Sequence, residues 1–265
     1  MKEDPKESAT VAEAESRAYA APALEKGLDI LELLARTGQP LTQKDIAQRL
    51  GRSIGEIYRM VACLVARNYL AVVDDNSYIL TTRLFELAQG NPPTHRLLLE
   101  AQPIMQRLAA ELDQSCHLTV YGQGKQVVLQ KVDSPSGMGF SVRAGAELEV
   151  LISASGRVLL AFQPADIRRL RIEECLQRRP QQASAQIEGI LDAVRARGYE
   201  STPSVQVRGL WAVSFPILDT QGRAIAALMV PYAERIDHMG RKLIPEVIDA
   251  LRKAALSLSR RVGGQ

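Results

Sequence analysis

The stretch from Asp45 to Met60, DIAQRLGRSIGEIYRM, indicates how the first part of the chain folds. Gly51 and Gly55 interrupt a pattern that otherwise indicates helix, although a glycine inside a helix costs up to ~1 kcal/mol relative to alanine. We interpret Gly51 as a turn residue with a positive φ angle. We interpret Gly55 as an outward-facing position, where the missing side chain allows another molecule to approach closely. The stretch therefore predicts two helices joined by a tight turn.

The second of these helices has one buried and one outward face. With Gln43 as the first position of a helix-turn-helix, Thr42 caps the first helix and Ala47 is small enough for a close helix crossing. At 100° per residue, the apolar residues of the second helix share one face: Ile57, Met60, Val61 and Leu64. The opposite face holds Arg52, Gly55, Arg59 and Cys63, with Glu56 and Tyr58 at its flanks.

Basic residues outnumber acidic ones around this motif, although the net charge of the whole chain is only +3. Between Arg36 and Arg67 the acidic residues are Asp45 and Glu56, and the basic ones are Arg36, Lys44, Arg49, Arg52, Arg59 and Arg67. Such a patch either binds phosphate groups or is simply a solvated helix surface. On the first interpretation, the candidate DNA contacts are Thr42, Gln43, Arg52, Ser53, Gly55, Glu56, Tyr58 and Arg59.

Ser53 and Glu56 allow two interpretations. The pattern Ser-x-x-Glu is a capping box, which stabilises the start of a helix. Alternatively, Ser53 holds a phosphate at the helix N-terminus and Glu56 accepts a hydrogen bond from a cytosine amino group. Both roles are compatible at different times. Arg59 faces outward with no acidic residue one turn away except Glu56, so we expect it to contact DNA, and Arg52 likewise.

Two short β-rich runs follow the helices, YLAVV and SYILT, on either side of Asp74–Asn76. A hairpin directly after a helix-turn-helix predicts a winged helix-turn-helix. Residues 82–89 form one more amphipathic helix, and GNPPT at 90–94 breaks the chain. We therefore expect a mobile tail at 1–22, a winged helix-turn-helix domain at 23–81, a linker helix and break at 82–94, and a second domain at 95–265.

The second domain is predicted to be a mixed α+β domain built on a central antiparallel sheet. We expect a helix over 95–112, strands at CHLTVYG and KQVVLQKV, and a further strand at MGFSVRAG. Helices are expected from SASGRVLLAF, around 167–176 and around 187–197. A hairpin turning at Thr220-Gln221-Gly222 and a helix over 241–260 complete the domain.

Several classes of protein are disfavoured by composition. Cys63, Cys116 and Cys175 are odd in number and lack C-x-x-C spacing, which argues against a disulfide framework and a zinc site and fits a reducing cytoplasm. No stretch has the ~18 apolar residues of a membrane span, and the N-terminus has no secretory signal. We expect no metal, no cofactor and no membrane partner.

Three segments carry a resemblance to a known family. The segment from Ala23 to Leu70 resembles the N-terminal winged helix-turn-helix of IclR-family transcriptional regulators, and SASGRVLLAF resembles the motif that begins a helix in the effector-binding domain of that family. The segment from Arg197 to Tyr232 resembles the closing hairpin of the same domain. The resemblance implies a cytoplasmic homodimer or homotetramer that reads a palindromic operator in double-stranded DNA. Its second domain would bind a small metabolite and mediate oligomerisation.

Two departures from the family pattern bear on specificity. The recognition helix has Gly55-Glu56 where the family often has Ser-Thr, so operator preference does not transfer. Effector-domain positions that are often acidic or hydroxyl-bearing are here Thr202, Ala212, Met229 and Pro231. This pattern indicates a less polar pocket and an effector that is a carboxylate with an apolar part.

The candidate effector-binding residues fall into two sets. The hydrogen-bonding set lies mainly at a helix start, a natural place for a carboxylate, and consists of Ser153, Ala154, Ser155, Gly156 and Ser214. For Ser153 and Ser155, plain N-capping is the alternative. The apolar set consists of Met138, Phe140, Leu151, Trp211, Ala212 and Met229, for which an ordinary core position is the alternative. Arg143 is either a carboxylate partner or a surface arginine.

Two other functions fit the sequence less well than a ligand-controlled regulator does. An enzyme with a Cys-His pair is disfavoured because Cys116 and His117 are neighbours on a strand and point to opposite faces. SASG also lacks the flanking pattern of a nucleophile elbow. An architectural DNA-binding protein without a ligand leaves the second domain unexplained.

Overall fold

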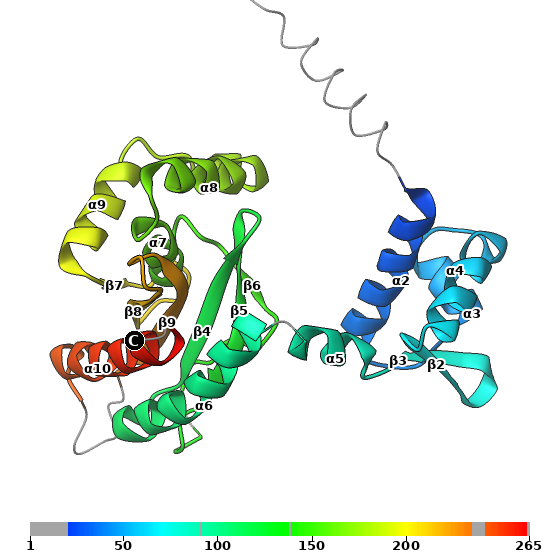
Figure 1. Ribbon diagram of the computed structural model, residues 1–265, viewed down its shortest axis with the longest axis horizontal. Coiled ribbons are helices and arrows are strands. Elements are labelled where there is room, and N and C mark those ends of the chain that lie inside the picture. Colours follow the sequence, from blue (N-terminus) through cyan, green and yellow to red (C-terminus); the bar gives the residue numbers. More distant parts are fainter. Residues whose placement is uncertain (1–20, 91, 138, 235–241, 264–265) are drawn as a thin grey trace, which may run out of the picture. The chain divides into compact units, whose positions relative to one another are not determined.

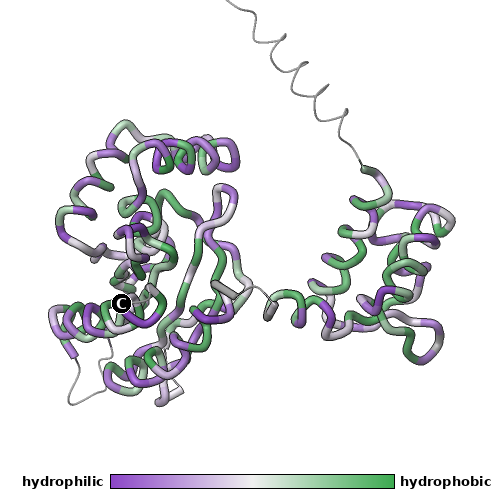
Figure 2. The backbone as a smooth tube through the Cα atoms, in the orientation of Figure 1, coloured by the Kyte–Doolittle hydropathy of each residue, from purple (hydrophilic) through white to green (hydrophobic). Residues whose placement is uncertain are grey.

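The computed structural model describes residues 21–90, 92–137, 139–234 and 242–263 (Figure 1). The chain divides into two compact units, Met1–Pro92 and Pro93–Gln265. Each unit has its own hydrophobic core. Hydrophilic and hydrophobic residues alternate along helices such as α8 and α10, as expected for helices with one buried face (Figure 2).

The first unit is a winged helix-turn-helix. Its elements in chain order are α2 (Pro22–Thr37), β1 (Leu41–Thr42), α3 (Gln43–Arg49), α4 (Ile54–Ala66), β2 (Leu70–Val73), β3 (Ser77–Leu80) and α5 (Arg83–Gln89). Strands pair in the antiparallel order β1-β3-β2, and the two-residue β1 was not predicted. The core joins all three helices of the motif through Ile30, Ile46 and Ile57, which are fully buried.

The turn between α3 and α4 has the predicted geometry. Gly51 has a φ angle of 64°, in the left-handed region, and its amide donates to the carbonyl of Gln48. Thr42 caps α3 in a capping box with Asp45. The tight turn that we derived from Gly51 is therefore confirmed.

The second unit is built on a six-stranded antiparallel sheet in the order β6-β5-β4-β9-β8-β7. Its strands are β4 (Cys116–Gly122), β5 (Lys125–Val132), β6 (Glu147–Leu148), β7 (Glu200–Pro203), β8 (Leu210–Leu218) and β9 (Ala224–Ala233). Its helices are α6 (Pro92–Leu112), α7 (Ala154–Ala161), α8 (Ala165–Arg178), α9 (Ile187–Arg197) and α10 (Ile244–Gly263). The central pair of strands joins β4 to β9, which is distant in the chain, so the six-stranded sheet cannot form without both halves of the domain.

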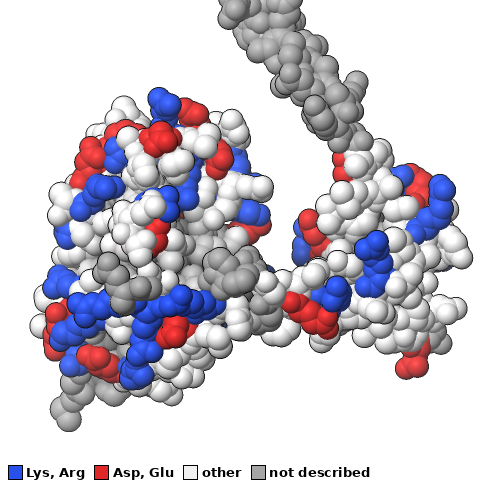
Figure 3. All heavy atoms as spheres, in the orientation of Figure 1, with Lys and Arg blue, Asp and Glu red and all other residues white. Residues whose placement is uncertain are grey.

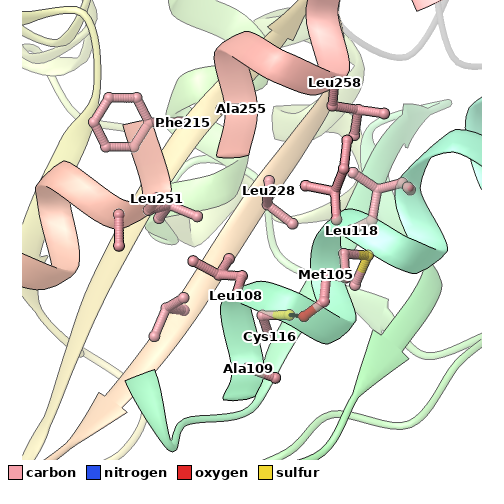
Figure 4. Close-up of a cluster of buried hydrophobic side chains, with 14 of the residues drawn as sticks. Met105, Leu108, Ala109, Cys116, Leu118, Phe215, Leu228, Leu251, Ala255 and Leu258 are labelled. Carbon is pink, nitrogen blue, oxygen red and sulfur yellow. Dashed lines mark hydrogen bonds between the residues drawn. The ribbon is translucent and has the colours of Figure 1, made fainter. Parts of the chain in front are cut away.

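The two faces of this sheet are covered differently. Helices α6 and α10 pack on one face, where Met105, Leu118, Leu228 and Leu251 form a dense core (Figure 4). On the other face, α7 packs against the sheet, and α8 and α9 pack against α7. Seven of the eight α7 residues are buried, which leaves the start of α7 as a fixed wall inside the domain.

Two sequence expectations for this domain need correction. The strand predicted at MGFSVRAG is wrong, because residues 139–145 form no strand and the sheet edge is the short β6 instead. Gly137 and Gly145 have positive φ angles at the two ends of this loop, and the Gly145 amide donates to the carbonyl of Val128 where the chain rejoins β5. Strand β7 was missed. The predicted site residue Met138 lies outside the described residues. Arg241, the predicted first residue of the last helix, lies outside them as well.

Candidate functional site

The start of α4 is held by its own side chains. Ser53 Oγ accepts from the amide of Glu56 at 3.3 Å, and a Glu56 carboxylate oxygen accepts from the amide of Ser53 at 2.9 Å. Glu56 also pairs with Lys26 at 3.2 Å. The hydrogen bond from the Ser53 amide, aided by Lys26, lowers the Glu56 pKa to about 2. The capping box is therefore formed, and base contact by Glu56 stays a prediction.

The outward face of α4 presents Gly55, Tyr58 and Arg59 to solvent, while Ile57 and Val61 are buried. Arg59 makes no ion pair within the described parts of the chain. Arg52 differs from our expectation because it is half-buried and pairs with Asp29 at 3.4 Å. Arg52 thus has an acidic partner, whereas Arg59 has none among the residues that the structure describes.

The two other predicted DNA contacts lie at the start of α3. Thr42 is engaged in its capping box with Asp45, whose pKa is lowered chiefly by the hydrogen bond from the Thr42 side chain. Gln43 Nε2 is buried without a hydrogen-bond partner among the residues placed by the structure. Basic and acidic side chains are mixed over the visible faces of both units (Figure 3), so the positive charge is local rather than general.

A cavity of about 270 Å³ opens in the second unit on the sheet face that carries α7. Loop residues 140–143 and 204–210 and the start of α7 surround it, and β4, β8 and β9 form its floor. Six of the predicted effector-binding residues line this cavity: Phe140, Ser153, Ser155, Trp211, Ala212 and Met229. Arg143 lines it too and brings a guanidinium group to the loop wall.

Four other predicted residues lie beneath the cavity wall rather than on it. Leu151 is buried in the core around α7, and Ala154 is buried in the first turn of that helix. Ser214 is fully buried and its hydroxyl donates to the carbonyl of Leu228 at 3.3 Å. Gly156 faces Val150, whose carbonyl oxygen would lie only 2.1 Å from an added Cβ.

The start of α7 is fixed by hydrogen bonds from distant parts of the chain. Ser153 Oγ accepts from the amide of Gly156 at 3.1 Å and from Gln126 Nε2 on β5 at 2.6 Å. The same hydroxyl donates to the carbonyl of Glu149 at 2.6 Å. The amides of Ala154 and Ser155 belong to the first turn of α7, where backbone amides have no acceptor within the helix.

Two buried polar side chains line the cavity without a partner. Ser155 Oγ and His117 Nε2 are inaccessible to solvent and make no hydrogen bond to any described residue. A buried polar group left unpaired costs about 1–3 kcal/mol, so a site with two of them favours a polar ligand. Burial lowers the pKa of His117 to about 4, which makes the imidazole neutral at physiological pH.

His117 is the functional candidate that sequence reasoning missed. It lies opposite Met229 in the β4–β9 pair, and Met229 lies opposite Ser214 in the next pair, so the three share one face. Cys116 points to the other face, where its thiol contacts the carbonyl of Met105 at 3.5 Å. Burial raises the Cys116 pKa to about 12. The available signal was a histidine at an inward position of β4, two residues before Thr119, which is also buried and polar.

Within residues 21–90, 92–137, 139–234 and 242–263, no helix has the length and apolar character needed to cross a membrane. No group of three or more His, Cys, Asp or Glu side chains in those same residues is arranged to hold a metal ion.

Comparison with known proteins gives consistent matches to both units. Residues 93–260 match the family described as Bacterial transcriptional regulator IclR C-terminal, and residues 23–74 match the IclR helix-turn-helix domain. The regulator KdgR of Escherichia coli strain K12 is 25% identical over 224 residues, covering 83% of this chain and 84% of KdgR. The glycerol operon regulatory protein of Streptomyces coelicolor is 28% identical over 244 residues, covering 91% and 96%.

A solved structure shares the fold over nearly the whole chain. The IclR homologue of Microbacterium hydrocarbonoxydans, crystallised with 4-hydroxybenzoate, superposes with a TM-score of 0.75 at 23% identity. The alignment covers 92% of this chain and all of that one.

Proposed function

The chain belongs to the IclR family of bacterial transcriptional regulators, and from this premise we propose that a small organic acid controls its binding to a palindromic operator. The observation that carries the effector part of the proposal is the cavity with two buried, unpartnered polar groups, Ser155 Oγ and His117 Nε2. An architectural DNA-binding protein without a ligand would not require such a cavity.

We propose that the effector is a carboxylate with a substantial apolar part. The first-turn amides of α7 supply donors and a favourable dipole for the carboxylate. Phe140, Trp211 and Met229 supply apolar surface, and burying ~150 Å² of ring or alkyl surface would favour binding by roughly 4 kcal/mol before ordering costs. The relative crystallised with 4-hydroxybenzoate supports an acid of this kind.

We propose that the operator is read by α4 from a homodimer or homotetramer acting in the cytoplasm. One recognition helix contacts too few base pairs for useful specificity. An oligomer places two such helices on paired half-sites and so contacts more of them. The proposed contacts are those predicted from the sequence, with Arg59 as the strongest because it is exposed and unpaired in the described residues. Effector binding would reposition the DNA-binding domains through α5 and change operator affinity by ~1–3 kcal/mol.

Gel-shift titration tests the DNA-binding part. Arg59→Ala should weaken specific binding by ~1–3 kcal/mol with little effect on folding. The matched control is Arg36→Ala, because Arg36 is an exposed arginine of the same unit that lies outside α4 and pairs with Glu32. Equal affinity of both variants would remove Arg59 from the DNA-binding surface.

Titration calorimetry tests the effector part. The full-length protein should bind benzoate or 4-hydroxybenzoate more tightly than glyoxylate. Ser155→Ala should weaken that binding, whereas Ser184→Ala, an exposed serine between α8 and α9, should not. Tight binding of glyoxylate with no binding of benzoate would contradict the apolar cavity.

A further inference from the structure

We propose that α4 reads its operator mainly through thymine methyl groups, contacted by Ile54 and Tyr58, with Arg59 as its one strong hydrogen-bond donor to a base. This inference deepens the proposed function and rests on it. It concerns the specificity of the DNA-binding surface, not the existence of that surface.

The first observation is an apolar pair at the start of α4. Ile54 is 49% exposed and Tyr58 is 61% exposed, although both are large and apolar. They are separated by one helical turn and therefore lie side by side. Gly55 lies beside them, and a Cβ added there would meet nothing within 4 Å. The first two turns of α4 thus present an apolar ridge next to an open backbone.

The second observation is the shortage of hydrogen-bonding side chains on the same face. Further along α4 the exposed positions are Ala62, Cys63 and Ala66, which are small. Both carboxylate oxygens of Glu56 already accept hydrogen bonds, from Ser53 and from Lys26. Ser53 is likewise occupied by its capping box. Among the described residues, Arg59 and the Tyr58 hydroxyl are the groups of this face with no hydrogen-bond partner.

An exposed apolar pair with few hydrogen-bonding side chains beside it favours thymine as the contacted base. Thymine is the base that presents a methyl group in the major groove, and apolar side chains contact it there. In helix-turn-helix proteins, the N-terminal residues of the recognition helix contact base edges, which are the positions of Ile54 and Tyr58. Arginine pairs best with guanine, so Arg59 adds a guanine contact.

Charge on the surrounding surface identifies DNA as the occupant of this apolar ridge. Lys44, Arg49 and Arg67 are exposed around α4 and carry the positive charge that a phosphate backbone requires. An apolar surface made for a protein partner would not need this basic border. A second copy of the chain would in addition place like charges against each other.

The test begins with selection of binding sites from random double-stranded DNA by the full-length protein. Each thymine of the selected half-site is then replaced singly by deoxyuridine, which removes only the C5 methyl group. At one or two thymines per half-site we expect a loss of affinity of about fourfold, the effect of exposing one methyl group. In Ile54→Ala or Tyr58→Ala, one of these uracil effects should vanish.

Controls and outcomes separate this inference from the proposed function. Leu170→Ala removes an equally exposed leucine from α8 and should keep every uracil effect. Selected sites whose affinity is unchanged at every uracil would overturn the thymine contacts while the regulator function stands. Full uracil effects in both Ile54→Ala and Tyr58→Ala would overturn it as well. Failure to enrich any sequence would overturn the proposed function and this inference with it.

Discussion

Two helix starts in this molecule carry the same serine cap in opposite surroundings. Ser53 precedes α4 and Ser153 precedes α7, both with extended backbone angles, and each hydroxyl accepts from the amide three residues on. The start of α4 is exposed to solvent and the start of α7 is buried against a sheet. The difference between them lies in where their remaining hydrogen-bond partners come from.

At α4 every partner except Lys26 comes from the same turn of helix. Glu56, three residues after Ser53, returns a hydrogen bond to the Ser53 amide. At α7 the equivalent residue is Gly156, which cannot do so, and Gln126 from β5 supplies the extra hydrogen bond. A local pattern is therefore enough to form a cap, but the sheet decides whether that cap becomes an exposed surface or a cavity wall.

The largest difference in stability between the two helix starts is expected from substitutions at the glycine in each first turn. Gly156→Val should destabilise the second unit by ~3 kcal/mol, because its Cβ would lie 2.1 Å from the Val150 carbonyl oxygen. The matched control Gly55→Ala meets nothing within 4 Å and should stabilise α4 by up to ~1 kcal/mol. Urea unfolding of the two variants measures both values, and a mild effect of Gly156→Val would contradict the close packing of α7.

The two regions should also lose stability in different pH ranges. Burial lowers the folded-state pKa of His117 from 6.5 to about 4, so the unfolded chain binds more protons between these values. This contribution of about 3 kcal/mol is complete above pH 6.5 and disappears as the pH falls to about 4. For Glu56, the lowered pKa gives stability that is present above pH 4.5 and lost as the pH falls toward 2.

Fluorescence of the single tryptophan, Trp211, follows the second unit in these experiments because it lies on β8. His117→Asn should flatten the stability of that unit between pH 6.5 and 4, whereas Glu56→Gln should leave this range unchanged. An unaltered profile in His117→Asn would show that other groups cause the loss.

A smaller effect is expected at the turn before α4. Gly51→Val should destabilise the first unit by ~1–2 kcal/mol, because a β-branched residue must adopt a φ angle of 64° there. Gly51→Asn is the control, since asparagine tolerates this conformation. Gel shift should show weakened operator binding in the valine variant alone, with an unchanged unfolding midpoint of the Trp211 signal. Wild-type operator affinity in Gly51→Val would contradict the strained turn.

The smallest effect belongs to the exposed cap itself. Ser53→Ala removes one capping hydroxyl and should cost ~1 kcal/mol of stability in the first unit. Ser53→Asn should restore most of that loss, since asparagine is also a good N-cap. Thermal unfolding of the three proteins makes the comparison, and identical curves would mean that the Glu56 hydrogen bond alone holds the helix start.

The sequence predicted those features whose causes lie within a few residues. Thr42 and Ser53 cap their helices, Gly51 takes its positive φ, and the hairpin after α4 turns at Asp74–Asn76, all from local patterns. Long-range pairing was not predictable in the same way. Strands β1 and β7 exist because β3 and β8 offer them an edge, not because of their own composition.

The candidate cavity was predicted only in part for the same reason. Phe140 was placed in the wrong kind of element, because residues 139–145 read as a strand and form a loop, yet it still lines the cavity. Ser214 and Leu151 were grouped with the lining, although Ser214 is fully buried and bonded to the Leu228 carbonyl, and Leu151 packs in the core around α7. His117 was passed over because its partner Met229 is more than a hundred residues away in the chain.

The place of β9 in the sheet has a consequence for synthesis of the protein. Strand β4 ends at Gly122 and its neighbour β9 begins at Ala224, about a hundred residues later. At ~5–20 residues per second, a ribosome needs roughly 5–20 s to make the intervening chain. During that interval the β4–β5 hairpin has an open, apolar inner edge, the kind of edge to which other chains add. The nascent protein is therefore most prone to aggregation after β5 emerges and before β9 does.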